Sequence, residues 1–324
     1  MAQRSTAPRV VRAILGAVSL NPAVLTAESL GGLQGSLAGH ALRPSRYGGA
    51  EVGSDEFVSQ VCELAALDGS LGWLATMFNA AACEVATLSD EVTLAVWGTD
   101  PDAVVATAHH GSGSVGPDGR LTGRWESVVG AHYADWLVLP TDNATGRILV
   151  ARDAAHVEPP NDPSDLAAAG IGDVTVADHR VDDRYAFTRN SRAAAFAMAG
   201  AAAAVTGSAD GVWRRHVEQM RARLATSYSG DELANAAPAH VGRAASDIDA
   251  TKLQITEALR QADAEAGGSW EYEQAVARAR SAADRLLGNS RHALDLNDAA
   301  TRLWQDVHAG CRLAASIFNA AAAD

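Results

Sequence analysis

Three side chains that could take part in chemistry fall on one side of a helix predicted near the C-terminus. Trp304, His308 and Arg312 are spaced four residues apart, so they follow one slowly drifting face. An imidazole can transfer a proton, but the carboxylate two residues away, Asp306, lies about 200° around the helix from it. His308 is therefore a catalytic candidate without a local acid–base partner, and a packed or capping histidine is the alternative.

Two further motifs favour structure over chemistry. Residues 111–116 read GSGSVG and match the pattern of a dinucleotide-binding loop, but such a loop must open a helix. The turn at Pro117–Gly119 follows directly, so we predict a flexible connection between strands instead. His109 and His110 are adjacent on a strand end and point to opposite faces, so they cannot easily share an ion, and we predict no metal site.

The composition argues against several classes of function. Lys and Arg total 26 against 39 Asp and Glu, a net charge of −13, and no basic cluster is present, so we predict no nucleic-acid partner. The three cysteines lie far apart, which favours a reducing cytoplasm. The N-terminal segment is basic and then apolar, but Arg12 interrupts it and no clear cleavage site follows. No stretch reaches the ~20 apolar residues of a membrane span, so we predict no membrane partner.

The elements that must position these residues come in three blocks. Residues 54–97 carry an apolar face at helical spacing, with Ser54 and Ser89 as predicted N-caps. Short β-type runs separated by turns follow, and helical stripes then return to the end of the chain. The sequence predicts an α+β protein with an N-terminal helical domain (1–101), a central β domain (102–187) and a C-terminal helical bundle (188–324).

Three stretches in this order match motifs of one enzyme superfamily. The first is RPSRYGGAE at residues 43–51 with DGSLGW at 68–73, similar to P-x-R-Y-G-G-x-E and D-x-S-x-G-W. The second, GRLTGRWESVVGAHYADW at 119–136, is similar to G-x-x-L-S-G-R-W-x-F-x-S-G-x-x-H-A-D-W. The third, RLWQDVHA at 302–309, is similar to R-x-W-R-D-V-H-A. Over most of its length the chain therefore resembles the flavin-dependent monooxygenase branch of the acyl-CoA dehydrogenase superfamily.

The resemblance implies that the central β domain holds FMN or FAD. Trp125, Ser127, Val129 and Gly130 stand where the family contacts the flavin. An indole beside hydroxyl and backbone donors suits a flat ring with polar atoms along one edge. A tryptophan buried at a domain junction and an ordinary strand serine are the alternatives.

The resemblance also implies residues on the substrate side. Trp73 and Trp304 stand there, and His308 becomes the catalytic candidate. No carboxylate occurs between Asp306 and Asp324, so a base of the dehydrogenase type is missing from that segment.

Four departures from the pattern set this chain apart. Val129 replaces a hydroxyl residue, AGIGD at residues 169–173 replaces a G-T-G-S-like run, and Gln305 replaces arginine. Leu313 stands about where this branch places a terminal-helix histidine. The chain is also short for the family.

We therefore predict a monooxygenase that uses reduced flavin from a separate reductase on a small aromatic or polyketide-like substrate. The alternative is a degenerate subunit, poor in flavin, that acts as a scaffold or ligand-binding partner of a catalytic paralogue. Residues 193–205 and 314–323 are more apolar than one bundle of this size needs. Together with the family's habit of symmetric assembly, they predict a homodimer or homotetramer.

Overall fold

The computed structural model describes residues 37–143, 145–159, 166, 168–226, 237–262, 268–287 and 298–322. The N-terminal segment considered for a secretion signal lies outside these residues. Within them, no helix is both long and apolar enough to cross a membrane. The chain forms two compact units: the first comprises Met1–Gly53, Met77–Pro160 and Ala167–Thr188, and the second Ser54–Thr76, Asn161–Leu166 and Arg189–Asp324. The predicted order of helices, β domain and helical bundle is confirmed, whereas the boundaries at 101 and 187 remain a prediction.

The predicted helical stretch at 54–97 is three helices, α3 (Ser54–Leu67), α4 (Gly69–Val85) and α5 (Asp90–Trp97). The break between α3 and α4 falls at Asp68, whose Oδ1 accepts a hydrogen bond from the Ser70 amide at 2.8 Å. Ser89 caps α5, as predicted, by accepting from the Val92 amide at 3.5 Å. Each break therefore coincides with a side chain that satisfies the first amides of the next helix.

The first unit contains two four-stranded sheets. One has the order β1 (Val105–Thr107), β4 (Trp136–Pro140), β5 (Gly146–Ala151) and β8 (Ala186–Thr188). The other has the order β2 (Gly111–Val115), β3 (Arg120–Val128), β7 (Gly172–Arg180) and β6 (His156–Glu158). Only β1 and β4 pair in parallel among these strands. The first unit also contains the 3-10 helices η1 (Leu37–His40), η2 (Ser45–Tyr47), η3 (Arg152–Ala154) and η4 (Asp183–Tyr185).

The GSGSVG segment is a strand, so the prediction of a flexible connection was wrong. All five residues of β2 pair with β3, and the turn between the strands closes with a 2.8 Å bond from the Gly116 amide to the Arg120 carbonyl. Gly119 adopts a φ of 74°, which favours glycine at the end of this turn. The rejection of a dinucleotide loop holds, because no helix follows the motif.

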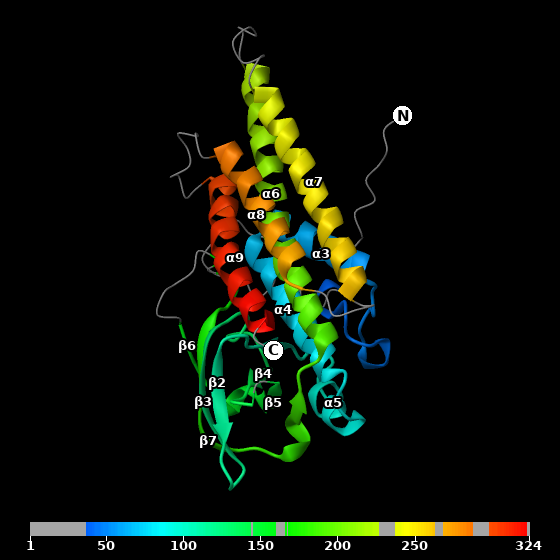
Figure 1. The fold of residues 1–324 in the computed structure, drawn as a ribbon, viewed down its shortest axis with the longest axis vertical. Coiled ribbons are helices and arrows are strands. Elements are labelled where there is room, and N and C mark those ends of the chain that lie inside the picture. Colours follow the sequence, from blue (N-terminus) through cyan, green and yellow to red (C-terminus); the bar gives the residue numbers. More distant parts are fainter. Residues whose placement is uncertain are drawn as a thin grey trace. The chain divides into compact units, whose positions relative to one another are not determined.

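The second unit is a helical bundle around α6 (Ser191–Thr226). This helix contacts α3, α7 (Ala237–Ala262), α8 (Trp270–Leu287) and α9 (Ala299–Ala322), and Figure 1 shows α6 to α9 running side by side. Small residues make the close approach possible: a Cβ at Gly207 would lie 2.3 Å from the Cys62 carbonyl oxygen. Residues 193–205 are accordingly packed inside this unit, and their apolar character needs no second copy to explain it.

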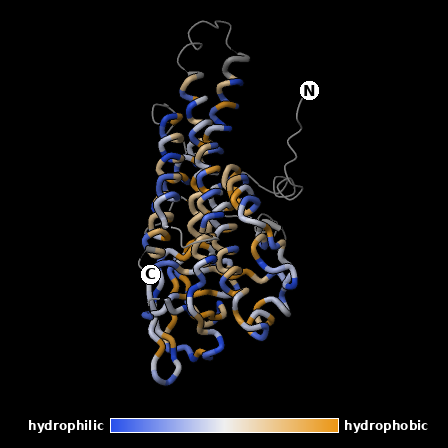
Figure 2. The backbone as a smooth tube through the Cα atoms, turned by 45° about the vertical axis from the view of Figure 1, so that its right-hand side comes forward, coloured by the Kyte–Doolittle hydropathy of each residue, from blue (hydrophilic) through white to orange (hydrophobic). Residues whose placement is uncertain are grey.

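The outer helices of the bundle are amphipathic, as their stripes predicted, and hydrophobic residues alternate with hydrophilic ones along them (Figure 2). Of the predicted stripe positions, Ala262 is half-buried and Ala266 lies outside the described residues. The following are buried: Ile248, Ile255, Leu259, Val276, Ala279, Ala283, Leu286, Leu303, Val307, Ala314 and Ile317.

An ionic cluster joins α3, α6 and α7 within the second unit. Lys252, the single lysine of the chain, lies 2.7 Å from Asp210, and Arg214 binds both Asp210 at 2.7 Å and Glu63 at 2.9 Å. Burial alone would lower the pKa of Lys252, but attraction and hydrogen bonding to Asp210 raise it overall.

Candidate functional site

The first resemblance motif, at residues 43–51, closes on itself as a structural turn. The Arg43 Nη1 donates to the Pro101 carbonyl at 2.7 Å, and the Ser45 hydroxyl donates to Glu51 at 2.9 Å. A Cβ at Gly49 would lie 1.8 Å from the Arg43 carbonyl oxygen, so only glycine fits. These contacts account for the motif without a ligand.

The second motif contains a β-bulge at the predicted flavin contact. Trp125 pairs with Val174 and Val128 with Gly172, so Glu126 and Ser127 on β3 lie opposite the single residue Asp173 on β7. Ser127 adopts a φ of 52°, a left-handed conformation that is unusual for a residue with a side chain. The bulge therefore turns the strand at a residue that the sequence singled out.

Asp173 satisfies this bulge with its carboxylate. The Ser127 amide donates to Oδ1 at 3.0 Å, and Arg124 Nη2 donates to Oδ2 at 2.9 Å. Asp173 is only 6% exposed, whereas Ser127 is exposed. The hydroxyl of Ser127 thus remains accessible while its amide is engaged.

The turn at Gly130 joins the second motif to residues 168–172. Gly130 has a φ of 79°, and its amide donates to the Ala169 carbonyl at 2.9 Å. The His132 amide donates to the Gly170 carbonyl at 3.1 Å. Gly170, with a φ of 55°, packs against Tyr133 so closely that a Cβ would lie 2.4 Å from the ring. Two segments identified separately in the sequence therefore lie side by side.

Trp125 lies beneath the same sheet. It is fully buried, and its Nε1 donates to the Pro140 carbonyl at 2.9 Å. A Cβ at Gly113 or Gly123 would lie 2.6 Å from the indole ring, which explains the glycine at the centre of the GSGSVG segment and its partner on β3. The indole thus supports the sheet from within, and the neighbouring Val129 is also buried at 5% exposure.

Trp73 on α4 is buried against α9 within the second unit. A Cβ at Gly310 would lie 3.1 Å from its Nε1, and this Nε1 has no hydrogen-bond partner among the described residues. Asp306 on α9 also contacts α4, because its Oδ2 accepts a hydrogen bond from the Gly69 amide at 3.3 Å. Asp306 therefore serves the start of α4 and not His308, as its angle on the helix predicted.

His308 has an acidic partner that the sequence did not reveal. Its Nε2 lies 2.9 Å from Oδ1 of Asp284 on α8, and the Trp304 Nε1 donates to the same oxygen at 2.8 Å. The indole and imidazole rings meet edge to face with centroids 4.5 Å apart. Trp304 and His308 are thus brought together by a carboxylate 24 residues away from His308 in sequence.

Trp73 does not belong to this group. Gly310 faces Trp73, and His308 lies two residues earlier, about 200° around α9. Of the two predicted substrate-side tryptophans, Trp304 belongs to α9 and lies on the side of His308, whereas Trp73 packs against the other side of α9 at Gly310. Leu313, where the resemblance places a histidine, is half-buried.

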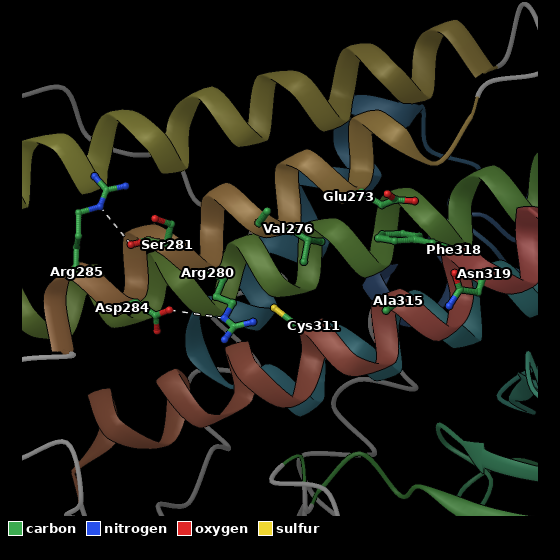
Figure 3. Close-up of a pocket in the computed structure, with 11 residues that line it drawn as sticks. Glu273, Val276, Arg280, Ser281, Asp284, Arg285, Cys311, Ala315, Phe318 and Asn319 are labelled. Atoms are coloured by element: carbon green, nitrogen blue, oxygen red, sulfur yellow. Dashed lines mark hydrogen bonds and ion pairs between the residues drawn. The ribbon is translucent and has the colours of Figure 1, made fainter.

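A groove of about 900 Å³ runs between α8 and α9 beside Asp284 (Figure 3). Its walls include Val276, Phe318 and Cys311, and the Arg280 Nε lies 3.6 Å from Asp284. Burial raises the pKa of Cys311 to about 11, so this thiol stays protonated near neutral pH. Among the residues that the structure describes, no group of three metal-ligating side chains occurs.

Comparison with known proteins finds relatives that align with most of this chain. No protein-family model matches it. HsaA of Rhodococcus jostii (strain RHA1), the oxygenase subunit of a flavin-dependent monooxygenase, is 26% identical over 329 residues, covering 87% of this chain and 86% of that protein. HsaA of Mycobacterium tuberculosis (strain ATCC 25618 / H37Rv) is 25% identical and covers 83% of this chain and 79% of its own length. Over most of its length the chain is similar to oxygenase subunits of flavin-dependent monooxygenases.

Solved structures show the same fold. The 3-HSA hydroxylase of Rhodococcus sp. RHA1 superposes with a TM-score of 0.80 at 22% identity, covering 96% of this chain and 93% of that one. XiaF from Streptomyces sp. also gives 0.80, at 19% identity and with 97% and 92% covered. The predicted resemblance to flavin-dependent monooxygenases, the fold class and the oxidoreductase class are confirmed, while the role of each site residue remains a prediction.

Proposed function

We propose that the protein is the oxygenase component of a two-component monooxygenase. It takes reduced FMN or FAD from a separate flavin reductase and oxidises a small aromatic or polyketide-like substrate. The exposed Ser127 hydroxyl, held on a left-handed bulge beside the Gly130 turn, is the observation that supports this function. One structural neighbour was solved with FADH2 and another, KijD3, with FMN, and one relative is an indole-3-acetate monooxygenase.

The residues of the β unit fit the polar edge of a flavin ring. Ser127 offers an exposed hydroxyl, and the positive φ values of Gly130 and Gly170 permit close approach of the backbone. Val129 offers no side-chain donor, and the Trp125 N–H is already bound to Pro140. Ser127 therefore binds the flavin edge, the Gly130 turn shapes the surface beside it, and Trp125 supports this surface from beneath.

Bound reduced flavin supplies the electrons that activate molecular oxygen. The chain contributes binding, exclusion of water and proton transfer. Because His308 Nε2 donates to Asp284, the neutral ring keeps a lone pair on Nδ1 that can accept a substrate proton. Trp304 fixes the ring from its edge, and the unpartnered N–H of the buried Trp73 offers a donor on the other side of α9.

An anaerobic titration with FMN and FAD, each oxidised and reduced, tests the proposed function. Reduced flavin is expected to bind with a Kd well below about 100 μM. Changes in flavin absorbance and fluorescence measure the binding. Absence of binding by either flavin in both redox states contradicts the proposal. It supports instead the alternative of a degenerate scaffold or ligand-binding subunit, which the buried Val129 favours.

Val129→Ser sharpens this titration. The added hydroxyl restores the missing donor and is expected to tighten flavin binding about 2- to 10-fold, the range of one net hydrogen bond. Val176→Ser is the matched control, since Val176 is equally buried but lies on β7 away from the turn. A gain in both variants, or in neither, argues against a flavin edge at Val129.

We also propose that the protein assembles as a homodimer or homotetramer. The support comes from the groove on α8 and α9, where the exposed Ala277 and Ala315 leave apolar surface open beside the buried Val276 and Phe318. Light scattering is expected to give twice or four times the 33.5 kDa of one chain. A single species of one chain mass at micromolar concentration contradicts the assembly without bearing on flavin.

A further inference from the structure

The Ser127 bulge holds a conformation that its own residue type disfavours. Among the described residues only Glu51, Ser127 and Asp178 combine a side chain with a positive φ. Such backbone persists where the surroundings impose it, and these positions cluster at ligand contacts. The feature that imposes it at Ser127 is therefore of functional interest.

Asp173 imposes this conformation from the opposite strand. Asp173 on β7 lies opposite both Glu126 and Ser127 on β3, so the Ser127 amide has no backbone carbonyl opposite it. The Asp173 carboxylate accepts from this amide instead. Burying a carboxylate is unfavourable unless hydrogen bonds and a cation compensate, and here the Ser127 amide and Arg124 supply both. The two bonds fix the carboxylate, and the carboxylate in turn fixes the amide.

The consequence appears at the Ser127 side chain. Its hydroxyl makes no hydrogen bond within the described part of the chain, and the residue is exposed. In the usual extended conformation of a strand, side chains alternate between the two faces, so loss of the left-handed turn would redirect this hydroxyl. The direction of the Ser127 donor thus depends on Asp173.

We infer that Asp173 is a positioning residue that aims the Ser127 hydroxyl at the polar edge of the flavin. The inference rests on the proposed function, because the flavin is the ligand that receives the donor. Asp173 itself is buried behind the strand and contacts the flavin through Ser127 only.

A double-mutant cycle on flavin affinity tests the inference. Asp173→Ala and Ser127→Ala are each expected to weaken reduced flavin about 3- to 10-fold, the effect of one misplaced or missing donor. The double variant is expected to lose no more than either single one, because both changes remove the same contact. Losses that multiply, or an unchanged affinity in Asp173→Ala, overturn the inference while the wild-type titration still stands.

A second measurement needs no flavin. Amide hydrogen exchange of the peptide covering residues 124–130 is expected to speed up about 10-fold or more in Asp173→Ala and to remain slow in Asp173→Asn, whose Oδ1 can still accept from Ser127. If the Asp173→Ala variant does not fold, Asp173→Asn still provides a folded protein in which the bulge can be measured. The peptide covering residues 176–181 is the internal control, because its bulge is held by Thr122.

The outcomes separate the two claims. Unchanged exchange in Asp173→Ala overturns the positioning role whatever the flavin result. Failure of the wild-type protein to bind flavin in either redox state overturns the proposed function and, with it, the role of Ser127 as a flavin donor.

Discussion

The pair β3–β7 contains two bulges that share one geometry and differ in chemistry. At one, Glu126 and Ser127 face Asp173; at the other, Ala177 and Asp178 face Thr122. In both, the second residue of the bulge has a φ of 52° and donates its amide to the side chain of the single residue opposite.

The acceptors differ in burial and charge. Thr122 and Asp178 are exposed, so water can satisfy the Asp178 amide if the 3.1 Å bond to the Thr122 hydroxyl is lost. Asp173 is buried, and it accepts a hydrogen bond from Arg124 at 2.9 Å. At the second bulge a neutral hydroxyl accepts the amide, while Arg120 donates to the Asp178 carbonyl at 2.6 Å on the exposed surface. Because a buried carboxylate is costlier than a hydroxyl as the amide's acceptor, its use indicates a demand for precise direction at Ser127.

The largest expected effect is that of Asp173→Ala. It leaves the Ser127 amide and the Arg124 guanidinium without their partner, and it is expected to lower the free energy of unfolding by about 1–3 kcal/mol. Denaturant unfolding followed by circular dichroism measures this. A loss no greater than that of Thr122→Ala would show that the two bulges are equivalent.

Substitution by glycine at each bulge has the next largest expected effect on the free energy of unfolding. Ser127→Gly and Asp178→Gly both remove the steric conflict of a left-handed side chain, so each is expected to raise the free energy of unfolding by about 0.5–1 kcal/mol. Only Ser127→Gly is expected to weaken flavin binding, because it also deletes the donor. Equal flavin affinities in the two glycine variants would remove the functional distinction between the bulges.

Thr122→Ala is expected to lower the free energy of unfolding by about 0.5 kcal/mol, the low end of the range for a hydrogen bond, because water replaces the hydroxyl at this exposed site. Flavin affinity should equal that of the wild-type protein in the same titration. A weakened affinity would mean that the two bulges act as one unit through β3.

Arg124→Gln is expected to have the smallest effect on the free energy of unfolding. Arg124 is 49% exposed at its side chain, so screening limits its ion pair with Asp173 to at most about 0.5 kcal/mol. The effect should shrink further when unfolding is repeated at high salt. A loss as large as that of Asp173→Ala would show that the charge pair, and not the amide, holds the bulge.

Much of the fold followed from local patterns. The stripes through Ile248 and Val307 predicted buried helix faces, and Pro117–Gly119 predicted the turn between β2 and β3. These features depend on residues a few positions apart, and the sequence contains that information directly. The motif resemblance then placed Ser127 and Gly130 in the β unit.

The site contacts depend on register and helix rotation, which local patterns do not contain. The bulge at Ser127 arises where two strands 46 residues apart slip by one position, and no residue type marks that slip. Asp284 meets His308 because α8 and α9 are rotated to face each other, although Arg280 and Asp284 look like an ordinary i, i+4 surface pair. The strand at GSGSVG was not predicted because Gly113 makes room for the buried Trp125 ring, a contact across strands.

The ionic cluster around Lys252 has a practical consequence. Because this is the chain's single lysine, reagents that acylate amines have one side-chain target, on α7. Acylation removes the positive charge that lies 2.7 Å from Asp210 and leaves that carboxylate to Arg214 alone. The raised pKa keeps the amine protonated and slow to react, so the labelling rate of this one position reports how often its ion pair with Asp210 opens.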